Sequence, residues 1–209
     1  MISADWSAAN KKRAESLLAA YPERRSAVMP LLYVAALEHG YVSEQAQRDV
    51  AAITGLTAAQ VQAVASFYTM YKREEVGEYL ISVCTSISCY LLGADDVLMA
   101  ISQETSTPDG EMSSDGMFSI EHVECIGACG GAPALQVNYE LVEGVGPDKG
   151  RELCRWLRDA RPGVVLGDEM QQLFGGRRSF DWGPAEDIGA TAPVPALDAF
   201  GNAVRGHAK

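Results

Sequence analysis

The chain has 209 residues, of which 47% are apolar, and a formal net charge of -11. This length and composition are enough to bury a core in one large or two small domains. The negative charge, without a cluster of Lys and Arg, argues against binding to the phosphate backbone of nucleic acids. No apolar run approaches the roughly 18 residues that a membrane span needs, and the first residues show no secretory pattern. We therefore expect a cytoplasmic protein.

Residues 1–76 are predicted to form a small N-terminal helical bundle. Helical periodicity appears over residues 7–20, 26–39, 43–54 and 57–68. Gly40 and Gly55 follow the second and third of these segments, where glycine often ends a helix. Thr57 and Gln60 have the spacing of a capping box. The short links between the segments favour antiparallel packing.

Residues 77–160 have a different pattern, which predicts a small open sheet with helices packed on it. Strands are expected over residues 79–83, 118–123, 134–137 and 139–145, and helices over residues 89–103 and 147–160. This order of elements predicts an α+β fold.

Residues 161–209 are rich in Gly and Pro, and their aromatic residues are irregularly spaced. We expect an extended C-terminal tail that lies along the surface of a partner. An unstructured terminus is the alternative.

Four of the five cysteines fall into two close pairs. Cys84 and Cys89 form a C-x4-C pair, and Cys125 and Cys129 form a C-x3-C pair. Each pair follows the end of a predicted strand, so two neighbouring strand ends would bring both loops to one edge of the sheet. Four thiolates at one point repel one another strongly unless a cation compensates their charge. The pattern therefore predicts a metal centre.

The spacing of the pairs favours iron over zinc. A [2Fe–2S] cluster takes two thiolates per iron, which matches ligands that arrive as two pairs. Structural zinc also accepts four thiolates, but its loops typically use a C-x2-C spacing that neither pair has. Gly127, Gly130 and Gly131 surround the second pair, where positive φ angles would turn backbone N–H groups toward sulfur. The hydroxyls of Ser86 and Ser88 are candidates for the same role.

The remaining candidate residues are predicted to be structural. Cys154 lies alone on a predicted helix and reads as a buried core thiol. His39, His122 and His207 are scattered, and none lies within a cysteine pair. No motif for a nucleotide site or a nucleophile is present, so we assign no catalytic residue.

At these residues the sequence resembles a known family, the thioredoxin-like [2Fe–2S] ferredoxin subunit of respiratory NADH:quinone oxidoreductase (complex I). The resemblance covers about residues 15–160. It is carried by SVCTSISC at 82–89, VECIGACGGAP at 123–133 and VASFYTMY at 64–71.

The resemblance implies a thioredoxin-like domain after the helical bundle, with one [2Fe–2S] cluster on Cys84, Cys89, Cys125 and Cys129. It implies docking on a flavoprotein subunit that binds FMN and NADH, contact with other complex I subunits, and single-electron exchange with FMN. The chain itself would hold no FMN or NADH site. The complex would place it at the inner face of the cell membrane.

Two alternatives remain open from the sequence. The chain could be the equivalent subunit of an NAD-linked hydrogenase or formate dehydrogenase, which use the same cluster beside a similar flavoprotein. It could also be an interaction module stabilised by zinc, without a redox role.

Overall fold

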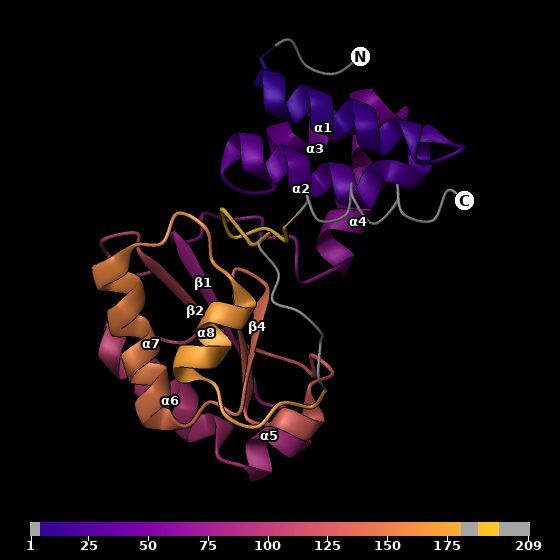
Figure 1. Ribbon diagram of the computed structural model, residues 1–209. Coiled ribbons are helices and arrows are strands. Elements are labelled where there is room, and N and C mark those ends of the chain that lie inside the picture. Colours follow the sequence, from indigo (N-terminus) through magenta and orange to yellow (C-terminus); the bar gives the residue numbers. More distant parts are fainter. Residues whose placement is uncertain (1–4, 181–187, 197–209) are drawn as a thin grey trace. The chain divides into compact units, whose positions relative to one another are not determined.

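A computed structural model describes residues 5–180 and 188–196 (Figure 1). The chain divides into two units between Glu75 and Val76, where the sequence placed the boundary after residue 76. Each unit has its own buried core.

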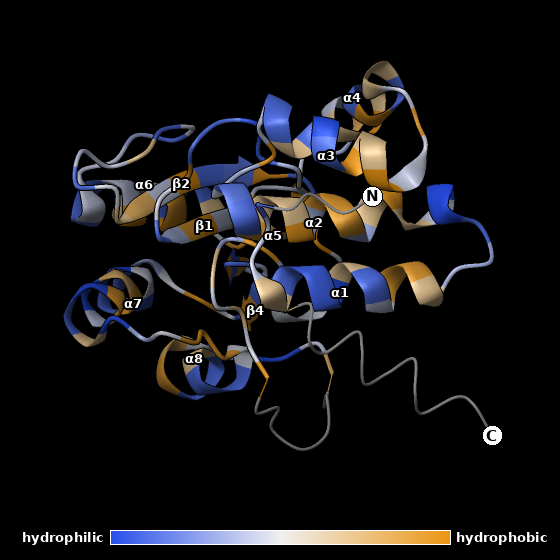
Figure 2. Ribbon diagram, turned by 90° about the horizontal axis from the view of Figure 1, so that it is seen from above, coloured by the Kyte–Doolittle hydropathy of each residue, from blue (hydrophilic) through white to orange (hydrophobic). Residues whose placement is uncertain are grey.

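The first unit consists of helices, in the places that the sequence predicts. Gly40 and Gly55 end two of them with φ angles of 84° and 78°, in the left-handed region that glycine adopts most easily. Thr57 and Gln60 form the predicted capping box. The second helix is largely buried and mostly orange in Figure 2. The helices are α1 (Ala8–Ala19), a 3-10 turn (Arg24–Ala27), α2 (Val28–His39), α3 (Glu44–Thr54) and α4 (Ala58–Phe67).

The second unit is built on a four-stranded mixed sheet in the order β2-β1-β3-β4. The first strand is central, buried along its whole length, and runs parallel to β2 and antiparallel to β3. The strands are β1 (Tyr79–Cys84), β2 (Phe118–Val123), β3 (Ala134–Val137) and β4 (Glu140–Glu143). This α+β arrangement confirms the predicted fold class.

The helix predicted over residues 89–103 is in fact two helices. These are α5 (Ile87–Leu91) and α6 (Ala94–Thr105), and Gly93 between them has a φ angle of 91°. A left-handed residue cannot continue an α-helix, so the chain turns there. The last predicted helix is present as α7 (Pro147–Ala160), which packs against α6 and places Leu153 and Leu157 in the core.

The extended tail predicted from residue 161 is wrong for the residues that directly follow α7. These residues include a further helix, α8 (Gly167–Phe174), which lies against β4 (Figure 1). Met170 and Phe174 are buried in the same core as the sheet, together with Val165. Helices α7 and α8 are amphipathic, with both blue and orange residues (Figure 2). Residues 181–187 and 197–209 of the predicted tail lie outside the described residues.

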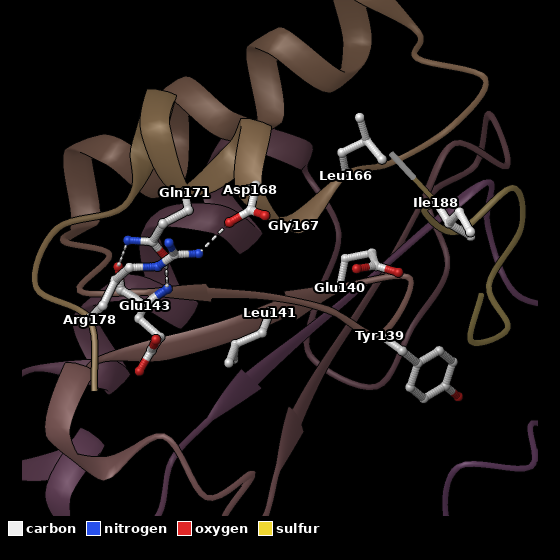
Figure 3. A pocket seen from close by; sticks show the side chains of 10 residues that line it. All are labelled: Tyr139, Glu140, Leu141, Glu143, Leu166, Gly167, Asp168, Gln171, Arg178 and Ile188. Atoms are coloured by element: carbon white, nitrogen blue, oxygen red, sulfur yellow. Dashed lines mark hydrogen bonds and ion pairs between the residues drawn. The ribbon is translucent and has the colours of Figure 1, made fainter. Parts of the chain in front are cut away.

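Polar side chains join α8 to the edge of the sheet (Figure 3). Gln171 accepts a hydrogen bond from the backbone N–H of Glu143 and donates one to its carbonyl oxygen, at 2.8 and 3.1 Å. Asp168, in the first turn of α8, pairs with Arg178 at 2.5 Å. These residues line a pocket of about 300 Å³ between α8 and β4. The segment after α7 is thus an integral part of the second unit.

Within the described residues, no single helix has the length and apolar composition that would let it cross a membrane. The helices α3 and α4 meet these criteria only as a pair, with a bend of 120° between them.

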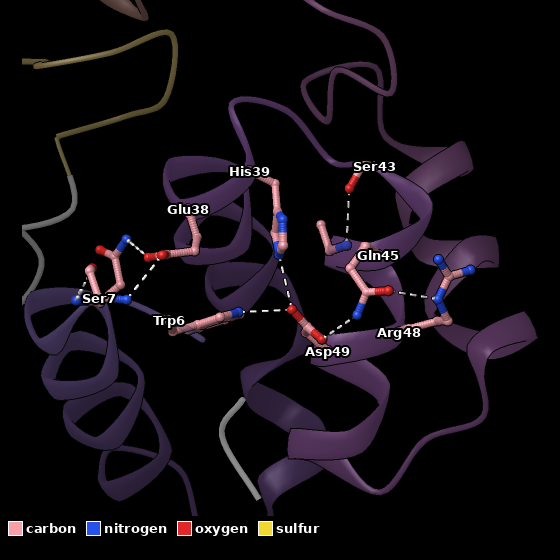
Figure 4. Close-up of polar contacts among 10 residues, drawn as sticks. Trp6, Ser7, Glu38, His39, Ser43, Gln45, Arg48 and Asp49 are labelled. Carbon is pink, nitrogen blue, oxygen red and sulfur yellow. Dashed lines mark hydrogen bonds and ion pairs between the residues drawn. The ribbon is translucent and has the colours of Figure 1, made fainter. Parts of the chain in front are cut away.

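In the first unit, a buried carboxylate joins α2, α3 and Trp6, which lies just before α1 (Figure 4). Asp49 is 8% exposed and accepts hydrogen bonds from Trp6 Nε1 and Gln45 Nε2, both at 2.8 Å. His39 Nε2 lies 2.9 Å from the same carboxylate. Burial by itself raises the pKa of Asp49, but the hydrogen bonds from Trp6, His39 and Gln45 outweigh it and hold the pKa below its usual range.

This lowered pKa predicts how the stability of the first unit depends on pH. The ionised Asp49 stabilises the fold fully above its unfolded pKa of about 4, and this contribution is lost as the pH falls through the lower folded value. We therefore expect Asp49→Asn to lose most stability near about pH 7, with a difference from the wild type that shrinks toward about pH 3. Urea unfolding of the wild type and of Asp49→Asn across this pH range measures the difference in their free energies of unfolding. A difference that stays constant would contradict the assignment.

Candidate metal centre

Both cysteine loops begin at the same edge of the sheet. Cys84 is the last residue of β1 and is paired in register with Val123, the last residue of β2. Just past this pair, the N–H of Thr85 donates to the carbonyl oxygen of Val123 at 3.1 Å. Cys125 follows two residues later. The parallel pairing of β1 and β2 therefore brings the starts of the two loops together.

The first pair of cysteines is buried against the second loop. Cys84 and Cys89 are each 2% exposed, and Cys89 lies in the short helix α5. Both pack in one cluster with Ala94, Ala134 and Ala128, the last of which lies between the two cysteines of the second pair. The two loops thus share an apolar contact beneath the thiols.

The second pair faces outward. Cys125 and Cys129 are exposed free thiols, and their Sγ atoms lie 3.8 Å apart. Gly127 between them has a φ angle of 86°, the left-handed turn that the sequence predicts for it. The same prediction is wrong for Gly130 and Gly131, which do not have positive φ angles. Their lack of a side chain instead allows close packing against residues 177–179 and Glu143.

A hydrogen bond joins the two loops at their outer side. Ser86 Oγ donates to Glu124 Oε2 at 3.3 Å. Ser86 thus donates to a carboxylate, whereas the sequence suggested donation to a cysteine sulfur; the role suggested for Ser88 stays a prediction.

The electrostatics link the two pairs. Burial raises the pKa of Cys89 to about 11. A hydrogen bond with Cys84 and the charges of Cys84 and Cys129 add to this rise, whereas a hydrogen bond from the N–H of Ala134 opposes it. The Cys89 thiol therefore resists ionisation unless a cation compensates its charge. Among the described residues, no three His, Cys, Asp or Glu side chains are grouped closely enough to hold one metal ion. The thiols instead form two pairs, and a binuclear cluster takes two thiolates per iron.

A family profile described as thioredoxin-like [2Fe-2S] ferredoxin matches residues 14–158. The chain belongs to this ferredoxin family. The match covers more than half of the chain and includes both cysteine pairs, so the resemblance seen in the sequence is confirmed. The cofactor of such a ferredoxin is a [2Fe–2S] cluster, and the paired thiols fit it.

Relatives of this ferredoxin include subunits of NADH-quinone oxidoreductases. It is 40% identical over 149 residues to a component of the NADH-quinone oxidoreductase of Mycobacterium tuberculosis strain H37Rv, and the match covers 71% of this chain and 59% of the relative. It is 38% identical over 128 residues to NADH-quinone oxidoreductase subunit 2 of Thermus thermophilus, where the match covers 60% of this chain and 71% of the relative. The chain thus spans about 59% of the length of the first of these relatives.

A solved structure shares the fold. The crystal structure of an NAD+-reducing [NiFe]-hydrogenase matches 63% of this ferredoxin chain and 23% of the matched chain, with a TM-score of 0.56 and 17% identity. At this level of identity the likeness concerns the fold alone.

The other candidate residues of the ferredoxin have structural surroundings. Cys154 is fully buried in the main core, where burial raises the pKa of its thiol to about 12. His122 Nδ1 lies 2.6 Å from Asp109, and His39 belongs to the Asp49 network. His207 lies outside the described residues.

The sequence did not predict the apolar surface beside Cys89. Four apolar side chains of α5 and the residue after it are exposed, at 58% or more each: Ile87, Tyr90, Leu91 and Leu92. Leu91 and Leu92 lie within the single helix that the sequence predicts over residues 89–103. The left-handed turn at Gly93 separates α5 from α6. Helix α6 buries its apolar residues Val97 and Ile101 in the core, whereas the apolar residues of α5 named above are exposed.

Proposed function

We propose that the chain binds its [2Fe–2S] cluster through Cys84, Cys89, Cys125 and Cys129, and that it transfers single electrons as a subunit of an NADH:quinone oxidoreductase. The observation that carries the proposal is the placement of two thiol pairs, one buried and one exposed, on loops that leave neighbouring parallel strands. The names of the relatives at 38% and 40% identity support the choice of host enzyme.

The two pairs would have different roles. When bound, the cluster accepts and returns one electron at a time. Cys84 and Cys89 anchor it on the buried side, where surrounding alanines exclude water. Cys125 and Cys129 lie on the open side, where a partner can approach closely. The open side is therefore the route for electrons into and out of the chain.

The partner would be a flavoprotein subunit that holds FMN and NADH. The four exposed apolar side chains of Ile87, Tyr90, Leu91 and Leu92 support docking beside the cysteine loops, because such groups are typical of a protein interface. Contact with the other subunits of the complex would hold the chain peripherally at the inner face of the cell membrane.

The first test is the metal content of the chain. Protein purified without oxygen is expected to be red-brown and to contain about two iron and two acid-labile sulfide per chain. Removal of the iron by a chelator should bleach the visible absorption. A colourless protein with one zinc would refute the proposal and support the zinc-stabilised interaction module.

The second test identifies the host complex. The chain is purified from its native cells with its neighbours, under mild detergent, and the neighbours are identified by mass spectrometry. A flavoprotein together with membrane-embedded quinone-reducing subunits is expected. A hydrogenase or a formate dehydrogenase subunit in their place would assign the chain to one of those enzymes.

A further inference from the structure

Glu143, at the end of the edge strand β4, is only 1% exposed. Its Oε1 atom accepts a hydrogen bond of 2.9 Å from the backbone N–H of Ser179. Its backbone carbonyl accepts bonds from the N–H of Gly176 at 2.8 Å and from Gln171 Nε2 at 3.1 Å. Figure 3 shows the Gln171 side chain facing the backbone of Glu143, whose carboxylate points away from Gln171. These bonds attach residues 176–179, which we name the clamp segment, to β4.

The clamp segment lies directly on the second cysteine loop. A Cβ atom at Gly131 would be 2.7 Å from the carbonyl oxygen of Arg177 and 2.5 Å from Glu143 Oε1. A Cβ atom at Gly130 would be 3.2 Å from both Cα and Oγ of Ser179. The clamp segment and Glu143 therefore leave no room for a side chain at Gly131, and a side chain at Gly130 would be tightly packed against Ser179. This contact explains the two glycines whose φ angles are not positive.

We infer that Glu143 is a positioning residue, which fixes the clamp segment against the loop that carries Cys129 and thereby slows the loss of iron. The inference rests on the proposed function, because it takes Cys129 as a cluster ligand. Gly130 and Gly131 directly follow Cys129, so the clamp segment restrains the backbone next to this ligand. The clamp segment lies beyond residues 14–158 that match the family profile.

The chemistry of the contact explains its expected effect. A hydrogen bond from a backbone N–H to a buried carboxylate is stronger than one between neutral groups. Removal of the carboxylate leaves the N–H of Ser179 without its acceptor, which favours local opening of the clamp segment. An open clamp segment frees the backbone at Gly130 and exposes the loop to chelators. An amide at position 143 keeps an acceptor oxygen in place.

The experiment compares variants of the full chain, purified with its cluster and without oxygen. Glu143→Ala removes the acceptor, and Gly176→Ala places a Cβ atom 2.8 Å from the carbonyl oxygen of Gly144. Glu143→Gln is the conservative variant. Gly163→Ala is the matched control, because a Cβ atom there meets nothing within 4 Å. The two readouts are the rate of iron release to a ferrous chelator and the rate of tryptic cleavage after Arg177.

Both rates are expected to rise about tenfold in Glu143→Ala and Gly176→Ala and about threefold in Glu143→Gln, which keeps only a neutral acceptor. They should change less than about twofold in Gly163→Ala. Ser179→Pro removes the N–H donor and leaves Glu143 intact, so it should behave like Glu143→Ala. If Glu143→Ala does not fold, Ser179→Pro replaces it in the test.

Unchanged tryptic cleavage in Glu143→Ala, Gly176→Ala and Ser179→Pro would overturn the inference, since the clamp segment would then be held by something else. Faster cleavage with unchanged iron release would also overturn it, because the clamp segment would have no effect on the ligand loop. A wild-type chain without iron would refute the proposed function itself. Cleavage of the variants relative to the wild type can also be measured on chains without iron, and it would separate that result from a failure of the clamp.

Discussion

Replacement of Cys125 by alanine is expected to abolish the EPR signal of the reduced cluster. The thiol of Cys125 is exposed and lies 3.8 Å from that of Cys129, so its removal leaves one iron with a single protein ligand. An exposed cysteine makes few core contacts, and its truncation by itself should cost less than about 1 kcal/mol of folding free energy. The expected result is a folded chain without a stable cluster. EPR spectra of the reduced protein and iron analysis of the same sample measure it.

Cys154→Ala is the matched control for this loss. Cys154 is fully buried in the main core, so its truncation leaves a small cavity and lowers stability by about 1 kcal/mol or more. The cluster signal should nevertheless be unchanged, because this thiol packs with Leu153 and Leu157 in a different core cluster from the two cysteine loops. A normal EPR spectrum from Cys125→Ala, or loss of the signal from Cys154→Ala, would refute the assignment of ligands.

Phe174→Ala is expected to destabilise the sheet unit by about 3–4 kcal/mol, a typical cost for truncating a buried aromatic side chain. Phe174 is 6% exposed, and its ring lies 5.6 Å from that of Trp156 on α7. The loss would show that α8 is part of the core, whereas an extended tail would be insensitive to this change. Amide hydrogen exchange, read in peptides from β4 and α7, measures the free energy of opening within this unit alone.

The neighbouring residue provides the control. Leu173 is 46% exposed, so Leu173→Ala should change the same free energy by less than about 1 kcal/mol. Equal effects of the two substitutions, or no effect of either, would mean that α8 does not contribute to the core.

The sequence alone predicted the [2Fe–2S] cofactor, which the family match confirms, and the strands that lead into the two cysteine loops. Ligation by these four cysteines stays a prediction. The spacing of Cys84, Cys89, Cys125 and Cys129 is a local pattern, and each pair follows a strand whose composition is easy to recognise. Parallel neighbours must end at the same edge of a sheet, so the convergence of the loops follows from the order of the elements. The helix ends at Gly40 and Gly55 were equally predictable, because they depend on the backbone freedom of one residue.

Only the tertiary structure shows the conformation and packing of the residues that follow α7. An eight-residue helix between glycines gains most of its stability from packing, and the sequence does not say which surface it will meet. The burial of Met170 and Phe174 depends on β4 and α7 being in place. The contact of residues 176–179 with Gly130 and Gly131 likewise joins segments far apart in the chain. Local patterns thus specify the cysteine loops, whereas long-range packing specifies what lies on them.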